Sequence, residues 1–228
     1  MFHFDILSLV AGIPGLLMAL VIHEYAHALI ADKMGDSTPR MTGRLTLNPI
    51  AHIDPIGLIM LLVAQFGWAK PVMINANNFR NWRKGEICVS LAGPCANFIL
   101  SLIMFAIRMI LFWSGVRMRS LDLVLDLIII YNINFGIFNL IPLPPLDGSR
   151  LITVFLPTEW AIRLASVERY SFLLLIVLMA TPVFSYILIP LQRLVYMLDY
   201  TIVQVLFYWI FHYFMSYMHA SCERRNLV

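Results

Sequence analysis

Long, uninterrupted blocks of apolar residues alternate with short polar segments along the whole chain. A helix needs about 20 apolar residues to cross the roughly 30 Å hydrocarbon core of a bilayer, and most of the blocks reach that length. The block at residues 56–66 is shorter and indicates a re-entrant segment. The sequence therefore predicts an all-α integral membrane protein, a polytopic helical bundle of about five to six apolar segments. The blocks lie at residues 6–30, 56–66, 87–113, 121–141, 172–191 and 194–217.

The composition agrees with a protein that has the lipid bilayer as its solvent. Of the 228 residues, 61% are hydrophobic and 13% are charged. The mean hydropathy of +0.81 lies far outside the range of soluble domains. The net charge of +3 comes without a basic tract that has interleaved aromatic residues, so we expect no nucleic-acid partner. The amino terminus lacks the features of a removable signal, so we expect the first helix to be retained.

The polar segment after the first block combines turn residues with a short alternating pattern. Polar and apolar side chains alternate at residues 44–47, within the stretch RMTGRLTLN. Such alternation is typical of a half-buried strand, so we expect a short strand or β-hairpin at residues 41–48. An ordinary surface loop is the alternative.

Basic residues are concentrated between the first block and the block at residues 87–113, and they favour the cytoplasm. We therefore expect the ligands described below to lie on the cytoplasmic side of a cell membrane, with the 56–66 block making no full crossing. The basic residues of this segment are Lys33, Arg40, Arg44, Lys70, Arg80, Arg83 and Lys84, whereas the loop at residues 113–121 holds Arg117 and Arg119.

Two histidines and a glutamate interrupt the first block, in the stretch HEYAH at residues 23–27. Residues four apart on a helix lie about 40° apart around its axis, so His23 and His27 project from one face and could bind one metal ion. Glu24 is offset from His23 by about 100°, where it could take a proton from the attacking water. This is the pattern of H-E-x-x-H metalloproteases. A polar patch between helices is the alternative, but ionisable residues inside a membrane are costly and are usually functional.

A catalytic zinc ion usually takes three protein ligands, so a third ligand must come from another segment. Asp147 follows three prolines in NLIPLPPLDGSR. Irregular backbone at membrane depth is tolerated only where it is buried in protein or lines a wet cavity, which makes Asp147 the best candidate. Asp122 and Asp126 are more typical of a helix end, and Asp54 and Asp126 are the next alternatives to test.

Three motifs together resemble those of the site-2 protease family of intramembrane zinc metalloproteases. They are HEYAH, GPCAN at residues 93–97 and NLIPLPPLDG at residues 139–148. The stretches GRLTLNPIAHIDPIG and FGWAKPV are similar to the small bacterial members without a PDZ domain. The resemblance implies one membrane-embedded protease domain over residues 1–228, with a catalytic core at about 6–150 and additional transmembrane helices at about 171–217.

The resemblance also implies roles for individual residues. His23, His27 and Asp147 would bind one Zn²⁺ ion, and Glu24 would be the general base. The substrate would be a transmembrane segment of another protein, held after unwinding by strand addition to the hairpin at residues 41–48. Neither the identity of this substrate nor the oligomeric state follows from the sequence.

Three asparagines inside apolar blocks are candidates for handling the substrate. Asn134 and Asn139 in NINFGIFN, and Asn97 in GPCAN, could donate to the substrate carbonyl or to the developing oxyanion. Alternatively, each could bond a neighbouring helix. For His52, in AHIDP, we favour a structural or accessory role.

Two other classes of function stay open at this point. One is a catalytically silent membrane chaperone or regulatory binder, which the full set of catalytic residues argues against. The other is a metal transporter, in which polar ligands would be distributed along several helices at different depths. Here the predicted ligands converge on one site with a glutamate beside it, so proteolysis is favoured.

Overall fold

The computed structural model describes residues 6–55, 57 and 70–225. Every regular element in these ranges is a helix, and no β-strand is assigned within them. The prediction of an all-α fold is therefore confirmed for this part of the chain.

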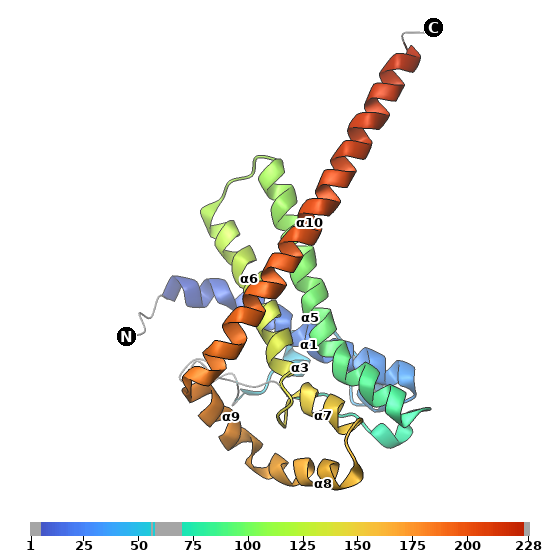
Figure 1. The fold of residues 1–228 in the computed structure, drawn as a ribbon, viewed down its shortest axis with the longest axis vertical. Coiled ribbons are helices and arrows are strands. Elements are labelled where there is room, and N and C mark those ends of the chain that lie inside the picture. The colour runs from blue at the N-terminus through green and yellow to red at the C-terminus, as the bar shows by residue number, and fades with distance from the viewer. Residues whose placement is uncertain (1–5, 56, 58–69, 226–228) are drawn as a thin grey trace.

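Three long helices form the centre of the molecule: α1 (Ile6–Met34), α5 (Trp82–Trp113) and α6 (Arg119–Asn139). Each of them packs against the other two (Figure 1). Among the described residues, Val10–Met34 and the whole of α5 and α6 are long and apolar enough to cross a membrane. The total of five to six apolar segments stays a prediction.

The core of this bundle consists of apolar side chains from several helices. Ile129 and Ile133 of α6 are fully buried and lie four residues apart, on one face of their helix. Phe105 of α5 and Val203 of α10 (Pro182–Arg225) belong to the same cluster. This shared cluster fixes α10 against the central helices.

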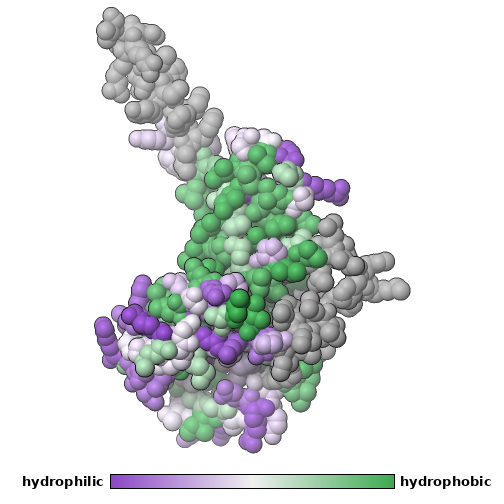
Figure 2. All heavy atoms as spheres, turned by 180° about the vertical axis from the view of Figure 1, so that it is seen from behind, coloured by the Kyte–Doolittle hydropathy of each residue, from purple (hydrophilic) through white to green (hydrophobic). Residues whose placement is uncertain are grey.

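A broad apolar band covers the middle of the molecule, with polar residues gathered mainly towards one end (Figure 2). On α5, Ile99, Ile103 and Ile110 are exposed large apolar side chains. An exposed apolar surface of this kind marks an interaction with a membrane or a partner. Together with the three long apolar helices, it describes a multi-pass membrane protein.

The loop after α1 contains two short helices, α2 (Thr38–Met41) and α3 (Pro49–His52), in place of the predicted hairpin. Residues 41–48 contain no strand because their polar backbone groups are satisfied locally. The N–H of Arg44 donates to the carbonyl of Pro39 at 2.8 Å, which closes a turn after α2. The Asn48 side chain accepts from the N–H of Ile50 and caps α3. The expectation of a strand or β-hairpin at residues 41–48 is thus corrected to a turn between two short helices.

The two ends of the long connection between α1 and α5 lie together. The N–H of Arg80 donates to the carbonyl of Met34 at 2.9 Å, so the end of α1 and the start of α5 are neighbours. Within the connection, the N–H of Lys70 donates to the carbonyl of His52 at 2.9 Å. The predicted re-entrant segment at residues 56–66 falls outside the described residues, apart from Gly57.

The C-terminal part begins with α7 (Asp147–Thr153) and α8 (Thr158–Val167), followed by η2 (Glu168–Tyr170) and α9 (Ser171–Ala180). The helix α10 then runs across α5 and α6 and extends beyond them (Figure 1). Its 44 residues would span about 66 Å at 1.5 Å per residue.

The helix boundary in this part differs from the prediction of separate segments at 172–191 and 194–217. The break lies at Thr181, whose backbone is extended, with φ −96° and ψ 149°. Pro182 explains this position, because proline disfavours a helical conformation in the preceding residue and fits the first turn of the next helix. Gln192 and Arg193 are good helix formers, so α10 continues through them.

Candidate metal centre

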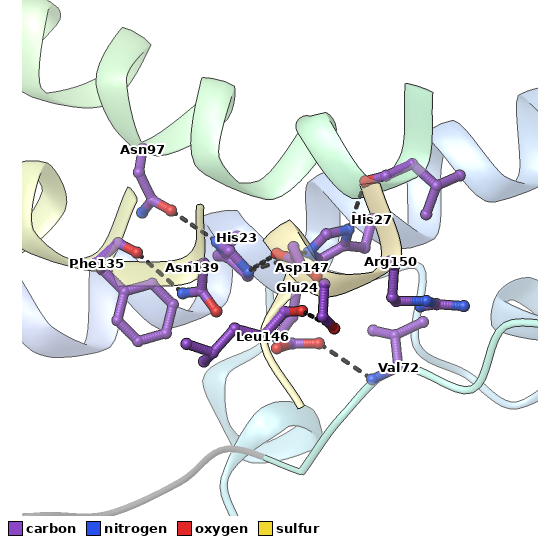
Figure 3. A network of polar contacts seen from close by, with 12 residues as sticks. His23, Glu24, His27, Val72, Asn97, Phe135, Asn139, Leu146, Asp147 and Arg150 are labelled. Atoms are coloured by element: carbon purple, nitrogen blue, oxygen red, sulfur yellow. Dashed lines mark hydrogen bonds and ion pairs between the residues drawn. The ribbon is translucent and has the colours of Figure 1, made fainter. Parts of the chain in front are cut away.

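Three side chains from two distant segments of the chain converge on one point (Figure 3). His23 and His27 lie on successive turns of α1, with their Nε2 atoms 3.0 Å apart. Asp147, the first residue of α7, places its Oδ2 atom 3.1 Å from Nε2 of His23 and 3.0 Å from Nε2 of His27. The two histidines are 3% and 5% exposed. Within the described residues, these three side chains form the group able to hold a metal ion.

The proline-rich loop after α6 brings Asp147 to the histidines. The helix α6 ends at Asn139, and the following prolines cannot donate the backbone hydrogen bonds that would extend it. Gly148 allows the loop to close on itself, because a Cβ atom there would collide with the backbone carbonyl oxygens of Leu140 and Ile141. The position of Asp147 therefore depends on the backbone of its neighbours.

Each histidine uses its other ring nitrogen to bond to a neighbouring group on α5. Nδ1 of His23 lies 2.8 Å from Oδ1 of Asn97, and Nδ1 of His27 lies 2.8 Å from the carbonyl oxygen of Val89. A carbonyl oxygen only accepts, so Nδ1 carries the proton in both rings. In a neutral ring the lone pair is then on Nε2, which faces Asp147. Three electron-pair donors thus converge on one point. A bound cation would stabilise this arrangement, because the donors otherwise repel one another.

Gly93 lets α5 approach the two histidines closely. A Cβ atom at this position would lie 2.5 Å from Cε1 of His23 and 2.5 Å from Nε2 of His27. Asn97, one turn further along α5, contacts His23. The GPCAN motif therefore lies at the candidate metal centre: its glycine leaves room for the two histidines, and its asparagine is hydrogen-bonded to His23.

Glu24 lies beside the three converging side chains and not among them. Its side chain is half-buried, and its Oε2 atom accepts a hydrogen bond from the backbone N–H of Val72 at 3.0 Å. Val72 is part of the segment that precedes η1 (Ala76–Asn78) and α5. This segment, residues 70–75, is called the strap below.

Asp36 fastens the end of the strap to the end of α1. Its carboxylate accepts from the N–H of Asn75 at 2.7 Å and from the side-chain amide of Asn78 at 2.8 Å. It also accepts from the backbone N–H and the hydroxyl of Thr38. Burial by itself would raise the pKa of Asp36, but these hydrogen bonds outweigh it and hold the pKa below its ordinary value of 3.8. Asp36 carries no signal in the sequence, because a lone Asp after a helix has no distinctive spacing.

The three candidate asparagines have different surroundings. Asn97 is fully buried and donates to the carbonyl of Ala19 and to Asn132, so its amide hydrogens are not free to meet a substrate. Asn139 lies beside the histidines in Figure 3 and donates to the carbonyl of Phe135 at 2.9 Å. Oδ1 of Asn134 is buried and has no hydrogen-bond partner in the described part of the chain. In this structure Asn97 instead contacts His23, and its predicted substrate-binding role stays a prediction.

The residues considered as alternative ligands are engaged elsewhere. Asp126 pairs with Arg108 at 2.9 Å, and Asp54 accepts from the N–H of Gly57. His52 is fully buried, with its Nε2 atom 2.8 Å from the carbonyl of Thr46. This contact joins α3 to the loop between α2 and α3, which agrees with a structural role for His52.

Comparisons with known proteins agree on one family. The model of "Peptidase family M50" matches residues 116–182, a range that includes Asp147. "Putative zinc metalloprotease YwhC" of Bacillus subtilis is 42% identical over 180 residues, which cover 77% of this chain and 82% of that protein. "Putative zinc metalloprotease Rip2" of Mycolicibacterium smegmatis is 32% identical over 182 residues, covering 75% of this chain and 66% of the relative.

A more distant relative is "Zinc metalloprotease MJ0392" of Methanocaldococcus jannaschii, which is 23% identical over 145 residues, or 64% of this chain and 34% of that protein. No solved structure matches the chain. The identity of 42% over most of both chains, together with the family match around Asp147, shows that the chain belongs to peptidase family M50, the site-2 protease family.

Proposed function

We propose that this protein is a zinc-dependent intramembrane protease that cuts a peptide bond within or near the transmembrane segment of another membrane protein. In this proposal His23, His27 and Asp147 hold the zinc ion, and Glu24 is the general base. The observation that carries the proposal is the convergence of two Nε2 atoms and one carboxylate oxygen within 3.1 Å of one another.

The converging atoms suit zinc by their chemistry and by their spacing. Two imidazole nitrogens and one carboxylate oxygen are a common ligand set of catalytic zinc, which keeps a fourth position open. Zinc bonds of about 2.0–2.2 Å in a tetrahedral arrangement separate ligand atoms by roughly 3.3–3.5 Å. The observed separations of 3.0 and 3.1 Å are close to this value. The names of the relatives, which call them zinc metalloproteases, agree with this choice of metal.

A bound zinc ion would act as a Lewis acid and would make a nucleophile available from water at neutral pH. The residues of the chain supply orientation and proton transfer. Glu24 projects about 100° from His23 around the helix axis, so it lies beside the ligands and not among them. One oxygen of its carboxylate is held by the N–H of Val72. The carboxylate can take a proton from the attacking water and give it to the leaving amine.

The position of the site indicates the class of substrate. His23 and His27 lie inside an apolar helix that can span a membrane, and Asn97 on the equally apolar α5 contacts His23. A peptide bond that reaches this depth belongs to a membrane-embedded segment, whose helix must unwind because its carbonyl oxygens are otherwise occupied. Asn139, beside the histidines, and Asn134 remain our candidates for a contact with the unwound substrate. We further propose that residues 6–150 form the catalytic core of a single domain.

We place the site towards the cytoplasmic side of a cell membrane. The end of α1 and the start of α5 are joined by the hydrogen bond between Met34 and Arg80, so both lie on the same side. This side carries most of the basic residues that flank the spans. Such residues are usually retained in the cytoplasm.

Metal analysis of purified variants tests the ligand set. We expect about one zinc ion per chain in the wild-type protein, because two histidines and one aspartate form one complete catalytic site. His23→Ala, His27→Ala and Asp147→Ala should each lose most of this zinc. Asp54→Asn is the matched control and should keep it, since the hydrogen bond of Asp54 in the described part of the chain is with Gly57 of its own loop. Full and tightly held zinc in Asp147→Ala would overturn the assignment of the third ligand.

A further inference from the structure

We infer that Asn132 is a positioning residue of the metal centre, and that it acts on His23 through Asn97. The inference rests on the proposed function, because it concerns the way in which His23 is presented to the metal. Asn132 lies on α6, Asn97 on α5 and His23 on α1, so the relay joins the three central helices.

The orientation of the Asn97 amide is determined by its partners. Its Nδ2 atom lies 2.8 Å from the carbonyl oxygen of Ala19 and 2.9 Å from Oδ1 of Asn132. Both partners are acceptors, so both amide hydrogens are used and the amide cannot be turned over without facing oxygen with oxygen. The remaining atom, Oδ1, is thereby directed at Nδ1 of His23.

Asn132 is fixed in the same manner. Its Nδ2 atom donates to the carbonyl oxygen of Ile128, one turn earlier on α6, at 2.8 Å. This bond turns Oδ1 of Asn132 towards Asn97. Both asparagines are fully buried, so no water competes for these positions. A buried amide without partners is costly, and the orientation is therefore well determined.

The hydrogen bonds of the relay all point in one direction. His23 donates to Asn97, Asn97 donates to Asn132, and Asn132 donates to the carbonyl of Ile128. Bonds in such a chain polarise one another. The relay holds the proton of His23 on Nδ1, leaves the lone pair on Nε2 and makes this nitrogen a better ligand. Without it, the ring could carry its proton on Nε2, which would face Asp147 and block the metal.

The second histidine does not share this arrangement. Nδ1 of His27 bonds to the backbone carbonyl of Val89, which a side-chain substitution does not remove. The tautomer of His23 alone is therefore set by side chains, and substitutions can test it.

The experiment compares zinc affinity in purified metal-free protein, measured by competition with a chelating dye. Asn132→Leu removes the acceptor for Asn97 at similar volume, and we expect zinc affinity to fall about 10-fold or more, as is typical when an outer partner of a ligand is lost. Asn132→Asp should restore most of the affinity, because a buried, protonated carboxyl can donate to Ile128 and accept from Asn97.

Ser101→Ala is the matched control. Ser101 is also fully buried, lies one turn beyond Asn97 on α5 and donates to Asp199 of α10 at 2.6 Å. Removing this hydroxyl deletes a buried interhelical hydrogen bond without touching the relay. Zinc affinity should stay at the wild-type value, even where thermal stability falls.

Wild-type zinc affinity in Asn132→Leu, or an equal loss in Ser101→Ala, would overturn the inference and leave the proposed function intact. Absence of zinc binding in the wild-type protein would overturn both. A second measurement needs no variant: nitrogen NMR of labelled histidine in the metal-free wild-type protein should show the proton of His23 on Nδ1. A proton on Nε2 in its place would contradict the relay.

Discussion

The Glu24 carboxylate accepts a hydrogen bond from the backbone N–H of Val72, 48 residues further along the chain, at 3.0 Å. The strap thus reaches the residue proposed as general base and holds one of its two carboxylate oxygens. The strap is itself fastened at Lys70 to His52 and at Asn75 to Asp36. The orientation of Glu24 therefore depends on a loop outside the helix that carries it.

Removing the Val72 N–H should slow proteolysis without releasing zinc. Val72→Pro deletes this donor, while Val72→Ala keeps it and removes only side-chain volume. A general base contributes about 10²- to 10⁴-fold to the reaction rate. Misorientation of Glu24 should remove part of this contribution, so we expect the cleavage rate of Val72→Pro to fall on the order of 10-fold. The cleavage rate and the zinc content of the two variants, measured side by side, check the expectation. Equal rates for both would show that the hydrogen bond does not orient Glu24.

Gly93→Ala should weaken metal binding by displacing the histidines. The added Cβ atom would lie 2.5 Å from atoms of His23 and His27, and overpacking of this kind costs about 1–3 kcal/mol. We expect lower zinc affinity together with a lower melting temperature. Cys95→Ala, on the exposed face of the same helix, is the control and should change neither. Unchanged zinc affinity in Gly93→Ala would mean that α5 can move away from the site.

The convergence of His23, His27 and Asp147 was largely predictable from the sequence, because its geometry is local or strongly marked. Helical spacing places His23 and His27 on one face, and the prolines before Asp147 indicate irregular backbone inside a membrane. Partners that meet across helices have no such signal. Asn132 and the strap residue Val72 are examples, since nothing in the sequence relates either of them to His23 or Glu24.

The two errors in the fold have local causes. The alternation at residues 44–47 indicated a strand, but Asn48 caps a short helix and the N–H of Arg44 closes a turn. The boundary expected between residues 191 and 194 rested on the polar pair Gln192 and Arg193. Polar residues do not end a helix, whereas Pro182 does begin one.

Asp36 should make the protein sensitive to acid. The pKa of its carboxyl is lower in the folded protein than its ordinary value of 3.8, so the ionised form is stabilised by folding. This contribution is present above pH 3.8 and is lost as the pH falls through the lower pKa of the folded state. Thermal unfolding in detergent between about pH 3 and pH 7 should show a loss of stability below about pH 4 that is smaller in Asp36→Asn than in the wild-type protein.

The same variant should already be less stable at neutral pH, because its amide has only one acceptor oxygen for the donors around it. Arg40→Gln is the control: Arg40 is an exposed partner of Asp32, and surface ion pairs contribute only about 0–1 kcal/mol. An identical pH profile for the wild-type protein and Asp36→Asn would exclude Asp36 as the source of the acid sensitivity.

Labelling of single cysteines should place both ends of the α1–α5 connection on one side of the membrane. In a variant without the native cysteines, cysteines introduced at Thr42 and Asn77 should react with an impermeant reagent from the cytoplasmic side. A cysteine at Ser114, in the loop between α5 and α6, should react from the opposite side, because α5 lies between the two positions and is long and apolar enough to cross a membrane. Reaction of Thr42 and Asn77 from opposite sides would contradict the arrangement of α1 and α5.

The central claim is that the protein is a protease whose general base, Glu24, lies in the HEYAH motif. It is tested most directly by Glu24→Gln. The amide keeps the size of the side chain and can still accept from Val72, but it cannot take up a proton. The measurement combines zinc content with cleavage of a reporter transmembrane segment that the wild-type protein cuts, beside a His23→Ala control. We predict near-normal zinc, retained capture of the reporter and a loss of about 10²-fold or more in cleavage rate. Cleavage by Glu24→Gln at the wild-type rate, with His23→Ala inactive, would contradict the account.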